Sequence, residues 1–434
     1  MTASTHINWF RPHCHSLGIG LAVFFSSALL AVLFWTLLPE RHKINRSSDY
    51  FDFYKPTAIN IYEGKGIVSS DGKPATRWPP GFPVLLAGVL AVSKWSTIPY
   101  ETCLLLFNAL SMALSSTLLF FIAKLYWSSF LALISALAWM IYPFALWLTK
   151  QPNSEMPFLV FFYAAIFLFA HALSKKHYSL GPYFLSGFLV GLSMLIRPIA
   201  IGAVFVLAVT FWLTARSVSK ATRTLVVVTL LFGNITAILP WELWVYSNTG
   251  NVTSRVNQGK AGIYYGLTYA VDPRGFRNHD PVPQDVATLM RRFVIRQDEM
   301  GSFSSIARVL LEETVVQPWS VTRLLFLKFV RSWYGTDSGD LERIILLVQL
   351  PYLLVLIWCS LRAWNAQGIS RELCIIVWLM VFYFWGMTIM VVSTLRYMVP
   401  AVGLLFLLLP ATIRVSKVKS AKAPAGQVAR NLNS

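Results

Sequence analysis

Two carboxylates follow the first apolar segment of the chain. Asp49 and Asp52 are three residues apart, a spacing that places both on one side of a helical turn. A carboxylate held near the bilayer surface and partly desolvated can have the raised proton affinity of a general base. Asp49 could equally cap a helix that begins at Tyr50, because Asp is an ordinary residue at helix starts. Catalysis and capping therefore both stay open.

Two arginines interrupt long apolar stretches. Arg197 separates the uncharged runs 178–196 and 198–215, and Arg396 has a similar position near the end of the chain. A charge there costs about 3 kcal/mol or more unless it faces a polar cavity or an anion, so both are candidates for binding a phosphate. The alternative is that each arginine marks a tight turn and extends to the interface. Arg77 is a weaker candidate because its loop is already polar.

Glu155 begins another apolar segment, where an acid also suits the helix dipole. A second carboxylate opposite Asp49 could bind the acceptor or a divalent cation, so Glu155 stays a candidate metal ligand and no other cofactor is assigned. Aromatic side chains can stack on a sugar, and cationic side chains can bind its phosphate. For most such residues the alternative is a solvated loop position with no role in binding. The further substrate-binding candidates of this kind are Tyr397, Arg255, Lys260 and Tyr264.

The segment 333–339 (WYGTDSG) is unusual in composition, with an acid between small and polar residues. It follows an amphipathic stretch and precedes an apolar one. The pattern assigns it no role.

The elements that hold these residues must be membrane helices. Of 434 residues, 56% are apolar and 13% are charged, against about 25% charged in soluble domains. The excess of 37 Lys and Arg over 19 Asp and Glu belongs beside lipid headgroups, and no basic stripe indicates a nucleic acid partner. The four cysteines are scattered, so neither disulfides nor a zinc site is expected.

An all-α integral membrane fold with about ten transmembrane helices follows from the length that a spanning helix requires. The first run is longer than a signal-peptide core, so we expect an uncleaved helix. An eleventh segment, 78–93, is short and proline-rich at its start, and could cross, re-enter or lie along the surface. The uncharged segments are 17–38, 102–123, 125–149, 156–174, 178–196, 198–215, 224–241, 344–361, 373–395 and 397–413.

Lys and Arg in short connections indicate the cytoplasmic side, here at 175–176, 216–223, 362–371 and the tail. If 78–93 crossed, 178–215 would be one kinked span and 150–155 would become cytoplasmic, so we favour the arrangement in which it does not cross. The predicted organisation is a cytoplasmic N-terminus 1–16, a polytopic domain 17–415 with extracytoplasmic loops 39–100 and 242–343, both containing juxtamembrane helices, and a basic, disordered cytoplasmic tail 416–434. The juxtamembrane segment of the first loop is 78–94. We expect a multi-pass protein of a bacterial inner membrane.

Several short motifs occur in an order that resembles a known family. The first set is an Asp just past the first helix, Gly64-x-Gly66, and Arg77-Trp78-Pro79-Pro80-Gly81-Phe82-Pro83. The second set is Asn153-Ser154-Glu155, GLSMLIRP at 191–198, Leu239-Pro240-Trp241 and Arg396-Tyr397 with Pro400. Together they resemble the polytopic glycosyltransferases of the protein O-mannosyltransferase and lipid A aminoarabinose transferase type, family 39-like, which have the GT-C fold.

This resemblance covers most of residues 15–415 but departs after Trp241, where an Arg-Asn pair is replaced by WVYSN at 244–248. It implies an inverting transferase that moves a sugar from a polyprenyl-phosphate carrier at the extracytoplasmic face. The first-loop Asp would deprotonate or orient the acceptor, and the best match is Asp49, with Asp52 in reserve. The implied partners are the polyprenyl-phosphate sugar donor, membrane lipids, and a protein, lipid or glycan acceptor.

Three other classes would fit a chain of this composition. A sugar-lipid polymerase or ligase would share the helical plan but concentrate its Arg and His residues in the late loop. A transporter or flippase of lipid-linked sugars would show repeated halves with broken helices, and the sequence shows no repeat. A non-catalytic scaffold predicts nothing about Arg197 or the Asp pair.

Overall fold

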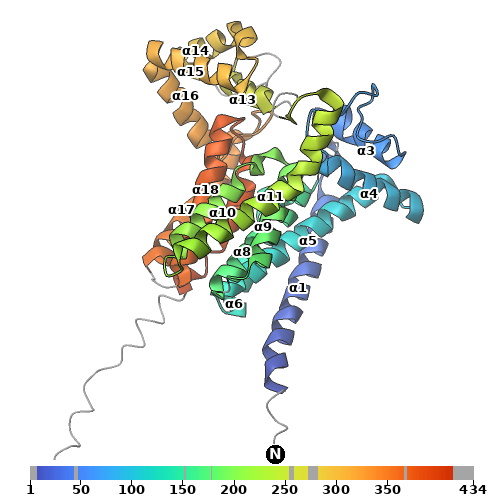
Figure 1. Ribbon diagram of the computed structural model, residues 1–434, viewed down its shortest axis with the longest axis vertical. Coiled ribbons are helices and arrows are strands. Elements are labelled where there is room, and N and C mark those ends of the chain that lie inside the picture. The colour runs from blue at the N-terminus through green and yellow to red at the C-terminus, as the bar shows by residue number, and fades with distance from the viewer. Residues whose placement is uncertain are drawn as a thin grey trace, which may run out of the picture.

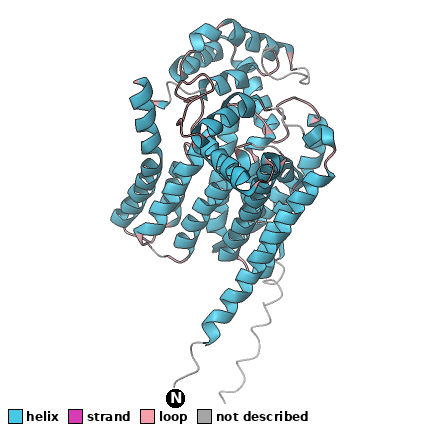
Figure 2. Cartoon of the chain, turned by 90° about the vertical axis from the view of Figure 1, so that its right-hand side faces the viewer, coloured by secondary structure: helices cyan, strands magenta, loops and turns pink. Residues whose placement is uncertain are grey.

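The computed structural model describes residues 7–43, 47–150, 153–176, 178–253, 259–271, 282–365 and 369–413, with the side chains of 7–15 and 369–370 left out. Within these ranges the regular structure is helical and no β-strand forms, apart from one isolated bridge between Val68 and Pro74 (Figure 2). The all-α class predicted from composition is confirmed. Arg255 and the basic tail 416–434 lie outside the described residues.

Six helices of the described part are long and apolar enough to span a membrane. They are α1 (Ile7–Leu37), α5 (Tyr100–Tyr126), α8 (Glu155–Ser174), α11 (Lys220–Thr249), α17 (Glu342–Asn365) and α18 (Ile369–Met390). A seventh span results if α6 (Ser129–Met140) and α7 (Pro143–Thr149), bent by 59° where Pro143 begins α7, are taken as one. The chain is therefore a multi-pass membrane protein by the length and composition of its helices.

Shorter apolar helices account for the remaining predicted segments. These are α4 (Gly81–Ser96), α9 (Leu180–Ile196), η2 (Pro198–Ala200) with α10 (Ala203–Thr214), and α19 (Val399–Phe406). Each predicted apolar segment thus contains a helix, and the short eleventh one is α4. How many of the shorter helices cross the bilayer stays a prediction, as do the domain limits and the side of the membrane.

The two predicted outer loops also contain helices. The first holds α2 (Glu40–Lys43), the π-helix η1 (Tyr50–Tyr54) and α3 (Lys55–Tyr62), and α3 packs beside α4 (Figure 1). The second contains α13 (Gly259–Thr268), α14 (Gln284–Ile295), η3 (Gln297–Met300), α15 (Phe303–Val316) and α16 (Pro318–Arg331). We call α13 to α16 the outer helices; they gather at one end of the molecule in Figure 1 around a core of their own that includes Leu289 and Phe293.

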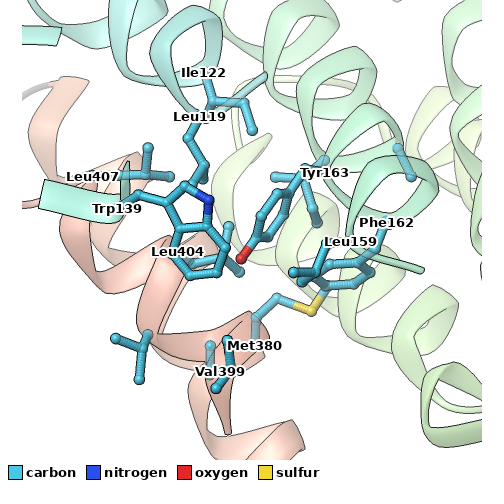
Figure 3. Close-up of a cluster of buried hydrophobic side chains, with 14 of the residues drawn as sticks. Leu119, Ile122, Trp139, Leu159, Phe162, Tyr163, Met380, Val399, Leu404 and Leu407 are labelled. Carbon is cyan, nitrogen blue, oxygen red and sulfur yellow. The ribbon is translucent and has the colours of Figure 1, made fainter. Parts of the chain in front are cut away.

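Part of the main core lies between α5, α6, α8, α18 and α19 (Figure 3). Two of its aromatic residues carry polar groups that find partners inside the core: the Tyr163 hydroxyl donates to the carbonyl of Pro400 at 2.9 Å, and Trp139 Nε1 donates to Ser115 Oγ at 3.2 Å. A Cβ at Gly403 would lie 2.1 Å from Tyr163 Oη. A glycine in α19 therefore makes room for this tyrosine, and the bond fixes the start of α19 against α8.

Helices α9 and α11 touch backbone to backbone. A Cβ at Gly187 would lie 2.0 Å from the carbonyl oxygen of Leu230, and one at Gly233 would lie 2.1 Å from that of Phe184. Small residues allow this close approach of membrane helices. Since α9 ends next to Arg197, the contact also positions that arginine.

We expect Gly187→Ala to lower the thermal midpoint of the detergent-solubilised protein by several degrees, because overpacking costs about 1–3 kcal/mol. Gly88→Ala in α4 is the matched control, since a Cβ there meets nothing within 4 Å. Equal midpoints for the two variants in differential scanning fluorimetry would contradict the close packing.

Candidate active site

The first outer loop is held against the end of α9. Tyr54 of η1 meets Phe82 of α4 edge to face, with ring centroids 5.0 Å apart. A Cβ at Gly81 would lie 2.7 Å from the backbone of Leu195, so this glycine lets the first turn of α4 lie directly on the last turn of α9. Arg197 follows α9 at once. The Asp49 segment and Arg197, which are distant in sequence, are thereby brought to the same end of the bundle.

Asp49 does not use its carboxylate as a helix cap. The residue occupies the N-cap position of η1, but its side chain makes no capping hydrogen bond. Asp49 Oδ1 instead accepts from Arg77 Nη2 at 3.1 Å and from Trp78 Nε1 at 3.4 Å, while Ser47 Oγ accepts from the amide of Tyr50 at 3.4 Å. With 38% of its side chain exposed, the carboxylate is oriented by two donors and still open to a substrate.

Asp52 has different surroundings. Residues 50–54 form a π-helix, in which the amide of Lys55 donates to the carbonyl of Tyr50. Because this turn is wider than an α-helical turn, residues three apart no longer lie on the same face. The Asp52 side chain is exposed. Among the hydrogen bonds and ion pairs of the described residues, none involves it. Of the two carboxylates, only Asp49 is built into a network.

Arg197 is buried in an ion pair. Its Nη1 lies 2.6 Å from Glu155 Oε1 and donates to Ser154 Oγ at 3.2 Å, while its guanidinium stacks 4.7 Å from the centre of the Tyr397 ring. Arg197 is 8% exposed and Glu155 4% exposed. The arginine therefore does not extend to the interface, and Glu155, although first in α8, does more than complement the helix dipole.

Arg396 joins the same group from the other side. Its Nη1 lies 3.0 Å from Asp337 Oδ2 and 3.8 Å from Glu155 Oε1, and its Nη2 donates to Tyr397 Oη at 3.4 Å. Burial alone would lower the pKa of Arg396, but Asp337, Tyr397 and Glu155 raise it well above its ordinary value. Arg396 is therefore charged. We call Arg197, Arg396, Glu155 and Asp337 the arginine–carboxylate cluster.

Tyr54 of η1 is influenced by charges from both Asp49 and this cluster. Burial raises the pKa of its hydroxyl, and the charge of Asp49 raises it further, while Arg197 lowers it and Glu155 raises it. Asp49 and the arginine–carboxylate cluster therefore lie at the same end of the bundle, and a site shared by Asp49 and Arg197 stays a prediction.

Several members of this site were not predicted. Asp337 belongs to the segment 333–339, whose unusual composition was the one signal it gave. Tyr54, Trp78 and Ser154 were part of quoted motifs or loops but carried no pattern that distinguished them as site residues. Each is identified by a contact to a residue far away in the chain.

Two further candidates from the late loop have their contacts among the outer helices. Tyr264 is buried in the core of those helices, and its hydroxyl donates to Gln297 Oε1 at 3.3 Å. Lys260 Nζ donates to the carbonyl of Gly301 at 2.9 Å. These bonds join α13 to the η3 region, so both residues help to hold the outer helices together.

The described residues do not fit a metal ion. No three His, Cys, Asp or Glu side chains gather in that part of the chain. The Glu155 carboxylate faces two guanidinium groups, an environment that repels a cation.

A cavity of about 940 Å³ lies elsewhere in the described part of the chain. It opens between α10, α17 and α18, and its mostly apolar lining includes Arg216, Trp364 and Arg371. These arginines belong to the connections predicted to be cytoplasmic. The cavity is therefore separate from the arginine–carboxylate cluster.

Two buried cations of α16 attach the outer helices to the segment that precedes Arg396. Lys328 Nζ donates to the carbonyls of Gly266 at 2.8 Å and Val391 at 2.9 Å. Arg331 Nη1 donates to the carbonyl of Ser393 at 2.8 Å, and its Nη2 pairs with Glu342 Oε1 at 2.5 Å. The position of Arg396 thus depends on these contacts between the outer helices and the segment before it.

Burial, and to a lesser extent the charge of Arg331, lower the pKa of Lys328 to about 7. An unfolded lysine has a pKa of about 10.4, so between these values the unfolded chain binds more protons and stability rises with pH. We expect this group to raise the thermal midpoint as the pH increases from about 7 to 9. Lys328→Met should abolish this contribution to the pH dependence. Lys260→Met, at a half-buried lysine of the outer helices, should leave this pH dependence unchanged. Parallel pH profiles for wild type and Lys328→Met would contradict the assignment.

The helical bundle and its outer helices match the GT-C fold. Among solved structures, archaeal oligosaccharyltransferase AglB from Archaeoglobus fulgidus, in complex with an inhibitory peptide and a dolichol-phosphate, matches with a TM-score of 0.53 and 14% identity over 93% of this chain and 52% of that one. The apo form of the Archaeoglobus fulgidus oligosaccharyltransferase gives 0.55 and 14%, over 92% and 51%. The chain thus spans about half the length of these enzymes.

Residues 78–244 match the family model described as dolichyl-phosphate-mannose-protein mannosyltransferase. No curated protein sequence matches the chain significantly. The fold and the family match over part of the chain agree with the resemblance seen in the motifs: the chain has a GT-C-like fold, and residues 78–244 are similar to the mannosyltransferase family.

Proposed function

We propose that this enzyme transfers a sugar from a polyprenyl-phosphate donor to an acceptor at the extracytoplasmic face of a bacterial inner membrane, with inversion at the anomeric carbon. The observation that carries the proposal is that Asp49, held by Arg77 and Trp78, lies at the same end of the bundle as Arg197, which Glu155 joins to Arg396. A base and a cationic site for a leaving phosphate are the two parts that such a reaction needs.

Asp49 is the proposed base. Arg77 and Trp78 both donate to its Oδ1, which fixes the carboxylate and leaves Oδ2 for the acceptor. As the acceptor oxygen or nitrogen attacks the anomeric carbon, its proton passes to Oδ2. The bond from that carbon to the phosphate oxygen breaks, and its electron pair leaves with the phosphate.

Arg197 and Arg396 are the proposed phosphate ligands. The departing phosphate gains a negative charge, and preorganised guanidinium groups stabilise it without an acid to protonate it. The Tyr397 ring lies 4.7 Å from one guanidinium and 5.1 Å from the other, so it holds both in place. Glu155 keeps the two arginines together.

The comparisons support a lipid-linked donor. The family description names a dolichyl-phosphate sugar and the related oligosaccharyltransferase was solved with a dolichol-phosphate and a peptide. The excess of Lys and Arg at the opposite connections supports a site outside the cytoplasm. A protein, a lipid or a glycan would each serve as acceptor.

The test is to incubate the purified enzyme with a panel of polyprenyl-phosphate sugars and candidate acceptors and to follow release of free polyprenyl phosphate. Release that depends on one donor and one acceptor, with an inverted product linkage, is expected. Movement of the intact donor across proteoliposomes without any release would overturn the proposal in favour of a flippase.

A further inference from the structure

The arginine–carboxylate cluster contains as many negative as positive groups. Arg197 and Arg396 face Glu155, and Arg396 also faces Asp337. A phosphate that joins both arginines would add negative charge to a balanced set. One of the two carboxylates must then give up its contact with an arginine.

The two carboxylates differ in how firmly they are held. Glu155 has 5% of its side chain exposed, stands in the first turn of α8 and lies within 4 Å of both arginines. Asp337 has 44% of its side chain exposed and contacts Arg396 from the loop between α16 and α17. Water can therefore solvate Asp337 after it leaves, whereas Glu155 would be left charged inside the protein.

The backbone beside Asp337 is fixed. The amide of Thr336 donates to Glu342 Oε1 at 2.9 Å, and its carbonyl accepts from Arg331 Nη2 at 2.8 Å. Thr336 Oγ1 also donates to the carbonyl of Asp340 at 3.2 Å. A turn of the Asp337 side chain about its own bonds is thus enough to release Arg396, and the loop need not open.

We propose that Asp337 competes with the phosphate of the polyprenyl carrier for Arg396. The phosphate displaces the Asp337 carboxylate on binding, and the carboxylate returns to Arg396 as polyprenyl phosphate leaves. Asp337 therefore weakens carrier binding and promotes product release. This inference rests on the proposed function and assigns a role to the segment 333–339.

The experiment measures binding of polyprenyl phosphate to the full-length protein in nanodiscs, for wild type, Asp337→Asn and Asp340→Asn. Asp340 is the matched control because it lies on the same loop, and none of the ion pairs of the described residues involves its side chain. We expect Asp337→Asn to bind about threefold to tenfold more tightly, as loss of a partly exposed ion pair allows, and Asp340→Asn to stay within about twofold of wild type. Polyprenol, which lacks the phosphate, should bind all three proteins equally.

Equal or weaker binding by Asp337→Asn, or the same gain in Asp340→Asn, would overturn the competition while leaving the transferase intact. If wild type bound polyprenyl phosphate no better than polyprenol, the phosphate site itself would be wrong, and the proposed function would fail with it. Thermal midpoints of the three proteins show that the loop variants fold alike.

Discussion

Asp49→Asn is expected to reduce sugar transfer by about 100- to 10,000-fold, the range that a general base contributes. Asparagine has the shape of aspartate, and its amide oxygen can still accept from Arg77 and Trp78 at the place of Asp49 Oδ1. It cannot accept a proton from the acceptor. The rate is measured as release of polyprenyl phosphate under saturating donor, and donor affinity should change little because Arg197 and Arg396 are untouched.

Asp52→Asn is the matched control for this prediction. It removes the same charge from the same short segment, but its carboxylate is exposed and outside the network of Asp49. Transfer by this variant should stay within about twofold of wild type, as for a surface substitution. Full activity of Asp49→Asn together with loss in Asp52→Asn would move the base to Asp52. Full activity of both would discard the carboxylate mechanism.

The helices could be predicted from the sequence because the bilayer imposes a length and a composition on each of them. Small shifts at the ends have local causes: the segment predicted at 78–93 is the helix Gly81–Ser96, whose start is delayed because Pro79 and Pro80 each disfavour helical backbone at the residue before them. The alternation of basic and neutral connections also predicts which side of the membrane each connection faces, and this topology stays a prediction. Each apolar segment by itself therefore predicts a membrane helix, and the fold class follows from the set of these helices.

The partners of the charged residues could not be predicted in that way. Whether Asp49 caps η1 or serves chemistry depends on Arg77 and Trp78, the former 28 residues further on. Asp337 is linked to the cluster by its ion pair with Arg396, and no sequence pattern connects these two residues. Conversely, Tyr264 has a residue type suited to sugars, yet it is buried in the core of the outer helices. Residue type suggests chemistry, but tertiary packing decides which side chains reach the site.

Arg197→Ala is expected to weaken both folding and donor binding. The substitution leaves Glu155, 4% exposed, with Arg396 at 3.8 Å as its remaining cation in the cluster. Breaking a buried pair from one side costs about 3–5 kcal/mol, so the thermal midpoint in detergent should fall by several degrees. Donor affinity should fall about 10- to 100-fold, because a charge-assisted hydrogen bond to the phosphate is lost.

A double variant separates these two effects. Arg197→Gln combined with Glu155→Gln removes the pair without leaving a buried charge, so its stability should recover to within about 1–2 kcal/mol of wild type. If Arg197 binds the phosphate, donor affinity must stay low despite this recovery, since neither glutamine carries a positive charge. Folding and binding would then change independently, which a purely structural ion pair does not allow. A double variant that regained both stability and wild-type donor affinity would leave Arg396 as the cation for the phosphate and restrict Arg197 to holding α8 against α9.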